Sequence, residues 1–169
     1  VTPRAPPAVT EDPEMRVYIA AWRAGWGVPG EIRDGRATLT KALGDPALRK
    51  LAHQLRLRVA LAHGELREYT DSFEYLRDNH IDRVDDNVNY WRLLALNGRR
   101  ADAVREALAY ANPPTSPGEA INMASAYQSL GMEKQAVEFV DKYLPMFPWF
   151  GELWQFQANQ LMTQKRQVR

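Results

Sequence analysis

Hydrophobic and polar residues follow a helical period along most of the chain. From Glu14 onward, apolar residues recur every three or four positions, and Gly, Pro or Asn interrupts the pattern every 12–18 residues. Runs typical of strands are nearly missing, and the one Asn-Gly pair, Asn97-Gly98, stands between two helical runs. The pattern therefore predicts an all-α protein built from short helices.

The interruptions themselves repeat. Gly64, Gly98 and Gly131 are 34 and 33 residues apart, and each separates a run with an apolar end from a second helical run. A glycine in this place can adopt the left-handed conformation that closes a helix. Helix–turn–helix units at a constant period indicate a solenoid, in which each unit buries its apolar face against its neighbours. We predict about four helix pairs plus a terminal helix, wound as a right-handed α-α superhelix.

The residues around these glycines resemble the tetratricopeptide-repeat family. Over 117–150 the family's places for large, small, aromatic and proline residues are filled by Met123, Ala124, Tyr127, Ala136 and Pro148. One period later, the matching places are filled by Trp154, Ala158 and Leu161. The two earlier units keep the period, although large rings stand at two of their small-residue places, at Trp91 and Tyr69.

Four of the eleven prolines lie in residues 1–13, which we expect to be an extended linker or leader. The rest, 14–169, is expected to form a single repeat domain. Its expected units are 14–49, 50–83, 84–116, 117–150 and a terminal helix over 151–169. Because Val1 is not Met, we expect the chain to be a piece of a larger protein.

The resemblance implies a binding groove lined by the first helix of each pair. Counting along each repeat places in this groove Gln54, Arg58, Val88, Arg92, Ser125, Gln128, Gln155 and Asn159, with Leu61, Ala95, Ile121 and Met162 between them. Arg58 and Arg92 occupy the same place in successive units. Beside amides and a hydroxyl, two guanidinium groups suit an extended acidic peptide or a charged polymer. The alternative is that each arginine pairs with an acid of its own layer. The carboxylate clamp of chaperone-binding family members is not matched, because Arg58 stands where that clamp has Asn.

Aromatic residues stand together in two further places, and we interpret the two places differently. The apolar segment 144–150 contains two prolines, and its Trp149 and Phe150 are secondary candidates for exposed anchors, with packing beneath the last helix as the alternative. Tyr18 and Trp22 are four residues apart, which is the spacing of a helix face that packs into a core. We interpret this second pair as core.

Charges form two runs of opposite sign. Residues 65–86 hold eight acids and three arginines, whereas 33–58 holds seven basic residues and two acids. We interpret both runs as solvated helix faces. A docking surface for a basic partner is the alternative for the acidic run.

Composition narrows the function classes. The net charge of +1 gives no general attraction to nucleic acid or anionic membranes, and without cysteine there can be no disulfide or thiolate zinc site. No apolar stretch is long enough to span a bilayer. His53 and His63 are ten apart and do not share a helix face, and no nucleophile elbow, phosphate-binding loop or dinucleotide fingerprint occurs. We therefore expect no metal, no cofactor, no enzymatic activity and no binding of nucleic acid.

These observations predict a non-catalytic scaffold that binds partner proteins and is part of a larger bacterial envelope protein. One alternative is a regulatory or targeting arm of an enzyme whose catalytic domain lies outside this sequence. Another is direct binding of a polysaccharide. Ala- and Arg-rich repeats behind a Pro-rich leader resemble periplasmic repeat scaffolds of exopolysaccharide export systems. The resemblance thus implies a periplasmic location, with the cytoplasm as the alternative.

Overall fold

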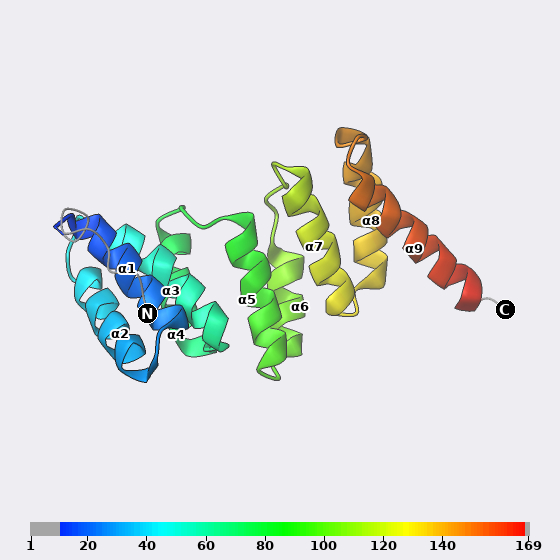
Figure 1. Ribbon diagram of the computed structural model, residues 1–169. Helices are drawn as coiled ribbons and strands as arrows, with labels where there is room; N and C mark the ends of the chain where they lie inside the picture. The colour runs from blue at the N-terminus through cyan, green and yellow to red at the C-terminus, as the bar shows by residue number, and fades with distance from the viewer. Residues whose placement is uncertain (1–10, 168–169) are drawn as a thin grey trace. The chain divides into compact units, whose positions relative to one another are not determined.

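The computed structural model describes residues 11–167, and all regular secondary structure within this range is helical (Figure 1). The prediction of an all-α fold is confirmed for these residues. The chain divides into two compact units, the first ending at Asp82 and the second beginning at Arg83. This border lies next to the predicted boundary between the repeats 50–83 and 84–116, although one domain over 14–169 was expected. The first ten residues of the predicted leader lie outside the described residues.

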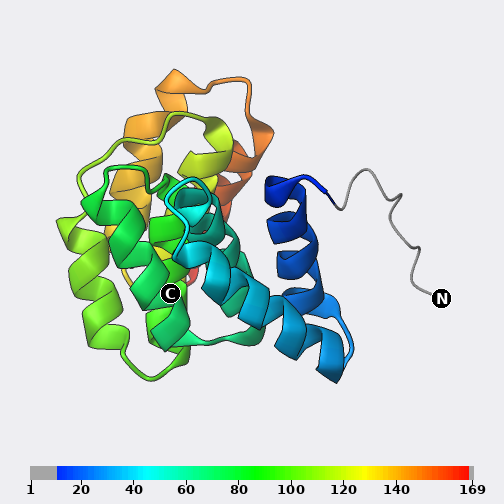
Figure 2. The ribbon, with the colours of Figure 1, turned by 90° about the vertical axis from the view of Figure 1, so that its left-hand side faces the viewer.

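The first unit consists of two helix pairs. Its helices are α1 (Pro13–Trp26), α2 (Pro29–Leu43), α3 (Arg49–His63) and α4 (Leu66–Asp78). Helix α1 pairs with α2 and α3 pairs with α4, while α3 also packs against both helices of the first pair (Figure 2). The shared core is formed mainly by small and aliphatic side chains of α1, α2 and α3, among them Val17, Ala20, Ala24, Leu39, Ala52 and Val59.

Local sequence explains where α1 begins. Pro13 occupies the first turn, where its missing N–H removes no helical hydrogen bond. The carboxylate of Asp12 accepts a hydrogen bond from the backbone N–H of Glu14 at 2.9 Å, which caps one of the otherwise unpaired donors. The helix therefore begins at the last residue of the predicted leader.

The helices α1 and α2 approach each other very closely at Gly35. A Cβ atom added there would lie 2.5 Å from the carbonyl oxygen of Ala20 and 2.8 Å from the backbone nitrogen of Ala24. Both distances are shorter than van der Waals contact, so only glycine fits without a shift of the backbone. The small residues of α1 are thus the ones that face its partner helix.

The second unit repeats the pairing. Its elements are α5 (Val84–Leu96), α6 (Arg100–Ala109), α7 (Pro117–Ser129), α8 (Glu133–Tyr143), the short 3₁₀ helix η2 (Leu144–Met146) and α9 (Gly151–Gln167). Helix α5 pairs with α6 and α7 with α8, and α5 also packs against α7. Helix α9 packs against both α7 and α8. The ring of Trp91 is buried, stacked on Tyr127 with ring centroids 5.9 Å apart.

The repeated glycines close helices as predicted. Gly64, Gly98 and Gly131 have φ of 69°, 77° and 70°, the left-handed region that glycine adopts without strain. After each glycine, the next backbone N–H donates at 2.9 Å to the carbonyl five residues earlier, in the pairs Glu65–Ala60, Arg99–Leu94 and Met132–Tyr127. This is the bond that ends a helix in a Schellman motif. His80, with φ 55°, occupies the same place after α4, and Ile81 donates there to Leu76.

Candidate functional site

The two arginines of the predicted groove have different surroundings. Arg58, on α3, is exposed and forms no ion pair with any residue that the structure describes. Arg92, on α5, is half-buried, and its Nη2 donates to the backbone carbonyl of Asn122 on α7 at 3.4 Å. The Asn122 side chain in turn donates to Asp85 at 3.0 Å. Arg58 and Arg92 belong to different compact units. Among the described residues, neither arginine forms an ion pair with an acidic side chain. The alternative interpretation of Arg58 and Arg92 had required such a pair.

The other groove residues fall into three groups. Gln128, Gln155 and Asn159 are exposed, and Gln54 and Ser125 are half-buried. Val88 is a correction to the sequence analysis, because only 1% of it is exposed and it belongs to the core. The reason is that α5 is covered around most of its circumference, with eight of its thirteen residues buried.

The two secondary candidates, Trp149 and Phe150, also differ in how exposed they are. Trp149 is 74% exposed, between η2 and α9. Phe150 is half-buried and packs against the hydrophobic cluster that α7, α8 and α9 share. Exposure therefore distinguishes Trp149 as the one available to a partner, whereas Phe150 serves packing.

The first helix carries an aromatic face that the sequence analysis assigned to the core. Tyr18 is 47% exposed, Trp22 48%, Trp26 65% and Met15 37%. At 100° per residue these four side chains lie within about 80° of one another around α1. We call them the aromatic face of α1. The interpretation of Tyr18 and Trp22 as core residues was wrong, because the close approach at Gly35 buries the alanine side of the helix instead. Small residues spaced along α1 were the signal that could have shown this.

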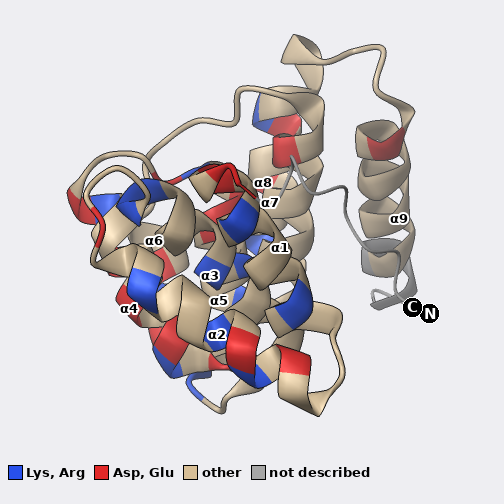
Figure 3. Ribbon diagram, turned by 60° about the vertical axis from the view of Figure 1, so that its left-hand side comes forward, with Lys and Arg blue, Asp and Glu red and all other residues tan. Residues whose placement is uncertain are grey.

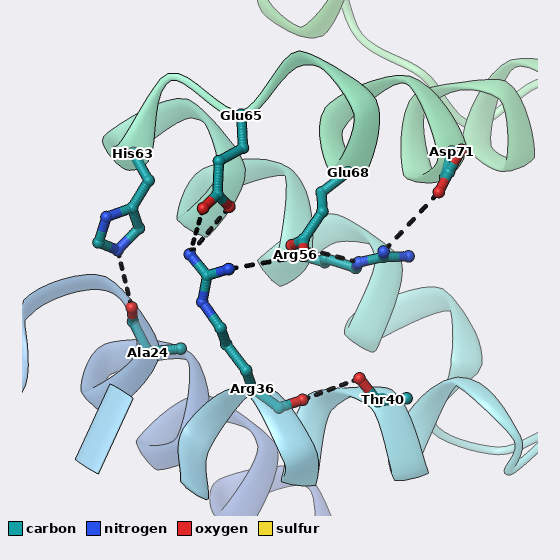
Figure 4. Close-up of polar contacts among 8 residues, drawn as sticks. All are labelled: Ala24, Arg36, Thr40, Arg56, His63, Glu65, Glu68 and Asp71. Atoms are coloured by element: carbon teal, nitrogen blue, oxygen red, sulfur yellow. Dashed lines mark hydrogen bonds and ion pairs between the residues drawn. The ribbon is translucent and has the colours of Figure 1, made fainter. Parts of the chain in front are cut away.

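Ion pairs between α2, α3 and α4 join the two charged runs of the first unit (Figure 4). The Nη2 atom of Arg36 lies 2.8 Å from both carboxylate oxygens of Glu65, and its Nη1 lies 3.5 Å from Glu68. Arg56 lies 3.8 Å from Glu68 and 3.9 Å from Asp71. The hydrogen bond to Glu65 is the main reason that the pKa of Arg36 is raised.

These pairs change the interpretation of the acidic run. Its first three acids, Glu65, Glu68 and Asp71, already lie beside arginines of the basic run 33–58. Acidic and basic segments accordingly lie next to one another over α2, α3 and α4 in Figure 3. The negative charge of these three acids is compensated within the first unit. A basic partner would therefore meet less uncompensated negative charge at this part of the acidic run.

Two of the three histidines, His53 and His63, have packing roles. The Nδ1 atom of His53 lies 3.2 Å from the hydroxyl oxygen of the buried Ser72, and its ring stacks on Tyr75 with centroids 3.9 Å apart. Burial, and then the charges of Arg56 and Arg49, lowers the pKa of His53 to about 4. His63 bonds through Nε2 to the carbonyl of Ala24 at 2.9 Å, which links α3 to α1 (Figure 4).

The described residues show little that resembles a metal site, a ligand pocket or a membrane-spanning helix. No group of three His, Asp or Glu side chains among them is arranged to hold a metal ion. A hollow of about 240 Å³ near α6, α7 and α8 is lined by residues such as Tyr110, Tyr127 and Phe139, and it is smaller than usual ligand pockets. In the part of the chain that the structure describes, no helix has the length and apolar character to cross a membrane.

The fold and these surfaces define a class of protein: an all-helical chain of paired helices with exposed aromatic surface. Comparison with known proteins finds no matching family model, no matching curated protein and no matching solved structure. The arguments for function therefore rest on the surfaces themselves.

Proposed function

We propose that this protein is a non-catalytic interaction scaffold of the tetratricopeptide-repeat type, which binds a partner protein through its exposed helix faces. The packing within each unit supports the repeat interpretation. The first helix of one pair lies against the first helix of the next, α1 against α3 and α5 against α7, which is how neighbouring repeats stack in a solenoid.

The observation that carries the binding function is the aromatic face of α1. Large apolar side chains that are exposed together mark interaction sites, because isolated exposed residues are common but clustered ones are rare. Two tryptophans and a tyrosine on one rigid helix offer wide contact area with little loss of conformational freedom. The same helix buries its opposite side, so its orientation is set by the core.

We propose that exposed arginines of the first unit select the partner. Arg16 and Arg23 are both exposed on α1, seven residues apart and along one edge of the aromatic face. On α3, Arg58 adds an exposed guanidinium without an ionic partner among the described residues. An extended partner segment with apolar side chains on the rings and carboxylates toward the arginines matches both features.

The test compares exposed tryptophans in two places. A partner captured from the source organism should bind Trp22→Ala/Trp26→Ala at least about 30-fold more weakly than the unaltered chain, as expected when central aromatic anchors are removed. Trp149→Ala is the control, because this tryptophan is 74% exposed, more than Trp22 or Trp26, but belongs to the second unit, and the affinity of this variant should be unchanged. Equal affinity of the double variant and the unaltered chain would rule out the aromatic face as the site.

A second candidate ligand is a polysaccharide, and the same aromatic face favours it. Flat rings exposed in a row along a helix can stack against the apolar faces of sugar rings. Glycan binding that disappears in Trp22→Ala/Trp26→Ala, with no protein partner captured by the unaltered chain, would replace the first proposal. The periplasmic location is proposed from the resemblance alone, and a reporter fusion active only in the cytoplasm would refute it.

A further inference from the structure

The hollow of about 240 Å³ lies between the second helices of the two pairs in the second unit, α6 and α8. One of its walls is the end of α6, at Ala107 and Leu108. Another wall is a single face of α8, whose four lining residues are spaced as i, i+3, i+4 and i+7: Gln135, Glu138, Phe139 and Lys142. The hollow is thus built from two helices that present regular faces to it.

This hollow stays open because α6 and α8 pack mainly on other helices. Helix α6 packs on α5, and α8 packs on α7 and α9. In the first unit, the corresponding helices α2 and α4 are joined by Arg36, which reaches Glu65 and Glu68. At the hollow, Leu108 of α6 is left 59% exposed instead. The second unit therefore presents an apolar surface where the first unit has ion pairs.

Aromatic rings that line the hollow are held in place by one another. Tyr127 packs edge-on against Phe139, with ring centroids 5.4 Å apart. The buried Trp91 stacks on Tyr127 at 5.9 Å and packs edge-on against Tyr110 at 5.5 Å. Tyr110, Tyr127 and Phe139 all line the hollow. An incoming group therefore meets a surface that is already ordered, and little conformational freedom is lost when it binds.

Stacking of a further repeat does not cover this surface. All residues that line the hollow belong to the second unit. They come from two helix pairs that are both in place, α5 with α6 and α7 with α8. A repeat packs only on its neighbours in the stack, so an additional helix pair would pack at an end and leave the space between α6 and α8 open. The hollow is accessible to a group from another molecule.

One positive charge at the hollow has no acidic partner among the described residues. Lys142 lines the hollow and forms no ion pair with any acid that the structure describes. Glu138, the acid on the same face, already lies 3.7 Å from Lys134. Asp141 accepts a hydrogen bond at 2.7 Å from Gln157 of α9, and it lies on a different side of α8. The uncompensated charge beside the rings is therefore positive.

We propose that the hollow binds an aromatic side chain of a partner protein, followed in the partner's sequence by an acidic residue whose carboxylate lies at Lys142. The volume suits one large side chain, because drug-sized ligands occupy larger pockets. Edge-on and offset contacts with the rings of the hollow favour an aromatic group. The carboxylate contributes selectivity more than affinity, because Lys142 is exposed. This site is separate from the aromatic face of α1, which belongs to the first unit.

The experiment titrates three capped dipeptides against the full chain and follows the backbone NMR signals of Leu108 and Phe139. Acetyl-Phe-Glu-amide should shift both signals saturably, with a Kd below about 5 mM, as expected for so small a ligand. Acetyl-Phe-Gln-amide, which lacks the charge, should bind about threefold more weakly. Acetyl-Ala-Glu-amide, which lacks the ring, should give no saturable shift.

Two pairs of variants test the charge and the apolar wall. Lys142→Gln should remove the preference for the Phe-Glu peptide over the Phe-Gln peptide, whereas Lys41→Gln, at an exposed position of the first unit, should retain it. Leu108→Ser should weaken binding of the Phe-Glu peptide at least about threefold, because part of the apolar wall is lost. Leu96→Ser is the matched control, since Leu96 is 82% exposed and does not line the hollow. Circular dichroism checks that all four variants keep their helices.

Four results would overturn the proposal. The first is no saturable shift with the Phe-Glu peptide, and the second is equal affinity of the unaltered chain for all three peptides. The third is equal affinity of Leu108→Ser and Leu96→Ser. The fourth is a dimer in sedimentation that Leu108→Ser dissociates, which would make a second copy of the chain the occupant. Because Trp22 and Trp26 are unchanged in these variants, binding at the aromatic face of α1 is scored separately.

Discussion

Arg36 shows how a single side chain links three helices of the first unit. It lies on α2 and reaches Glu65 and Glu68 at the start of α4, while Glu68 also lies near Arg56 of α3. The Arg36 side chain is only 29% exposed, so these bonds are less screened than those of a surface pair. The residue thus connects the first helix pair to the second.

Replacing Arg36 should therefore destabilise the first unit. We expect Arg36→Ala to lower the free energy of unfolding by about 1–2 kcal/mol, because two charge-assisted bonds are lost and Glu65 and Glu68 remain side by side. Arg33→Ala is the control, since Arg33 is 82% exposed beside Asp34, and it should change stability by less than about 0.5 kcal/mol. Urea unfolding of both variants measures the difference. Equal stability of the two would show that the Arg36 pairs contribute nothing.

His53 makes the stability of the first unit depend on pH. Its pKa in the folded chain is about 4, below the ordinary 6.5, so the unfolded chain binds the proton more tightly. The stabilising effect of the neutral ring is complete above about pH 6.5 and is lost as the pH falls toward 4. Between pH 7 and pH 5 we expect a loss of about 1 kcal/mol, after allowance for the partial exposure of the ring.

The comparison of His53→Gln with the unaltered chain isolates this effect. Glutamine can still hydrogen-bond to Ser72 but takes up no proton in this range, so the decrease in stability between pH 7 and pH 5 should become smaller. His80→Gln, at an exposed position, controls for the general effect of removing a histidine. The same decrease in His53→Gln as in the unaltered chain would assign the pH dependence to other groups.

At the scale of helices, the crossing of α1 and α2 depends on Gly35. A methyl group there would meet backbone atoms of Ala20 and Ala24, which cannot move without shifting α1. We expect Gly35→Ala to destabilise the first unit by about 1–3 kcal/mol, although alanine is the better helix former.

Gly25→Ala is the matched control for this crossing. Gly25 also lies in a helix, and a Cβ added there meets nothing within 4 Å. Its replacement should be neutral or should stabilise by up to about 1 kcal/mol, through helix propensity. Opposite signs for the two variants in thermal unfolding would confirm the close approach, and stabilisation by both would contradict it.

At the scale of the whole molecule, the division at Asp82 and Arg83 predicts two independent folding units. Each unit has a hydrophobic cluster of its own, one around α1, α2 and α3 and the other around α7, α8 and α9. We expect fragments 1–82 and 83–169 to fold separately. Their circular dichroism spectra should add up to that of the full chain, and each fragment should unfold cooperatively. A fragment with the spectrum of an unfolded chain would show that its unit depends on the other.

The sequence by itself determined the helices and their turns. The apolar period from Glu14 onward predicted an all-helical chain, and the spacing of Gly64, Gly98 and Gly131 predicted where helices close. Both features are local. A helix is recognisable from residues three and four positions apart, and a left-handed closing residue depends on hydrogen bonds within about six residues. The pairing of neighbouring helices follows from the short turns between them.

Only the tertiary structure decided which side of each helix meets another helix. Tyr18 and Trp22 have core spacing, but they are exposed because alanines pack α1 at Gly35, and Val88 is buried because other helices cover α5. The pairing of Arg36 with Glu65 and the hollow lined by Phe139 likewise depend on which helices stand opposite. Periodicity places residues on a common face but leaves open what covers that face, because the covering residues come from segments distant in sequence. Burial is therefore a property of the assembled helices, and the candidate binding faces became visible only with them.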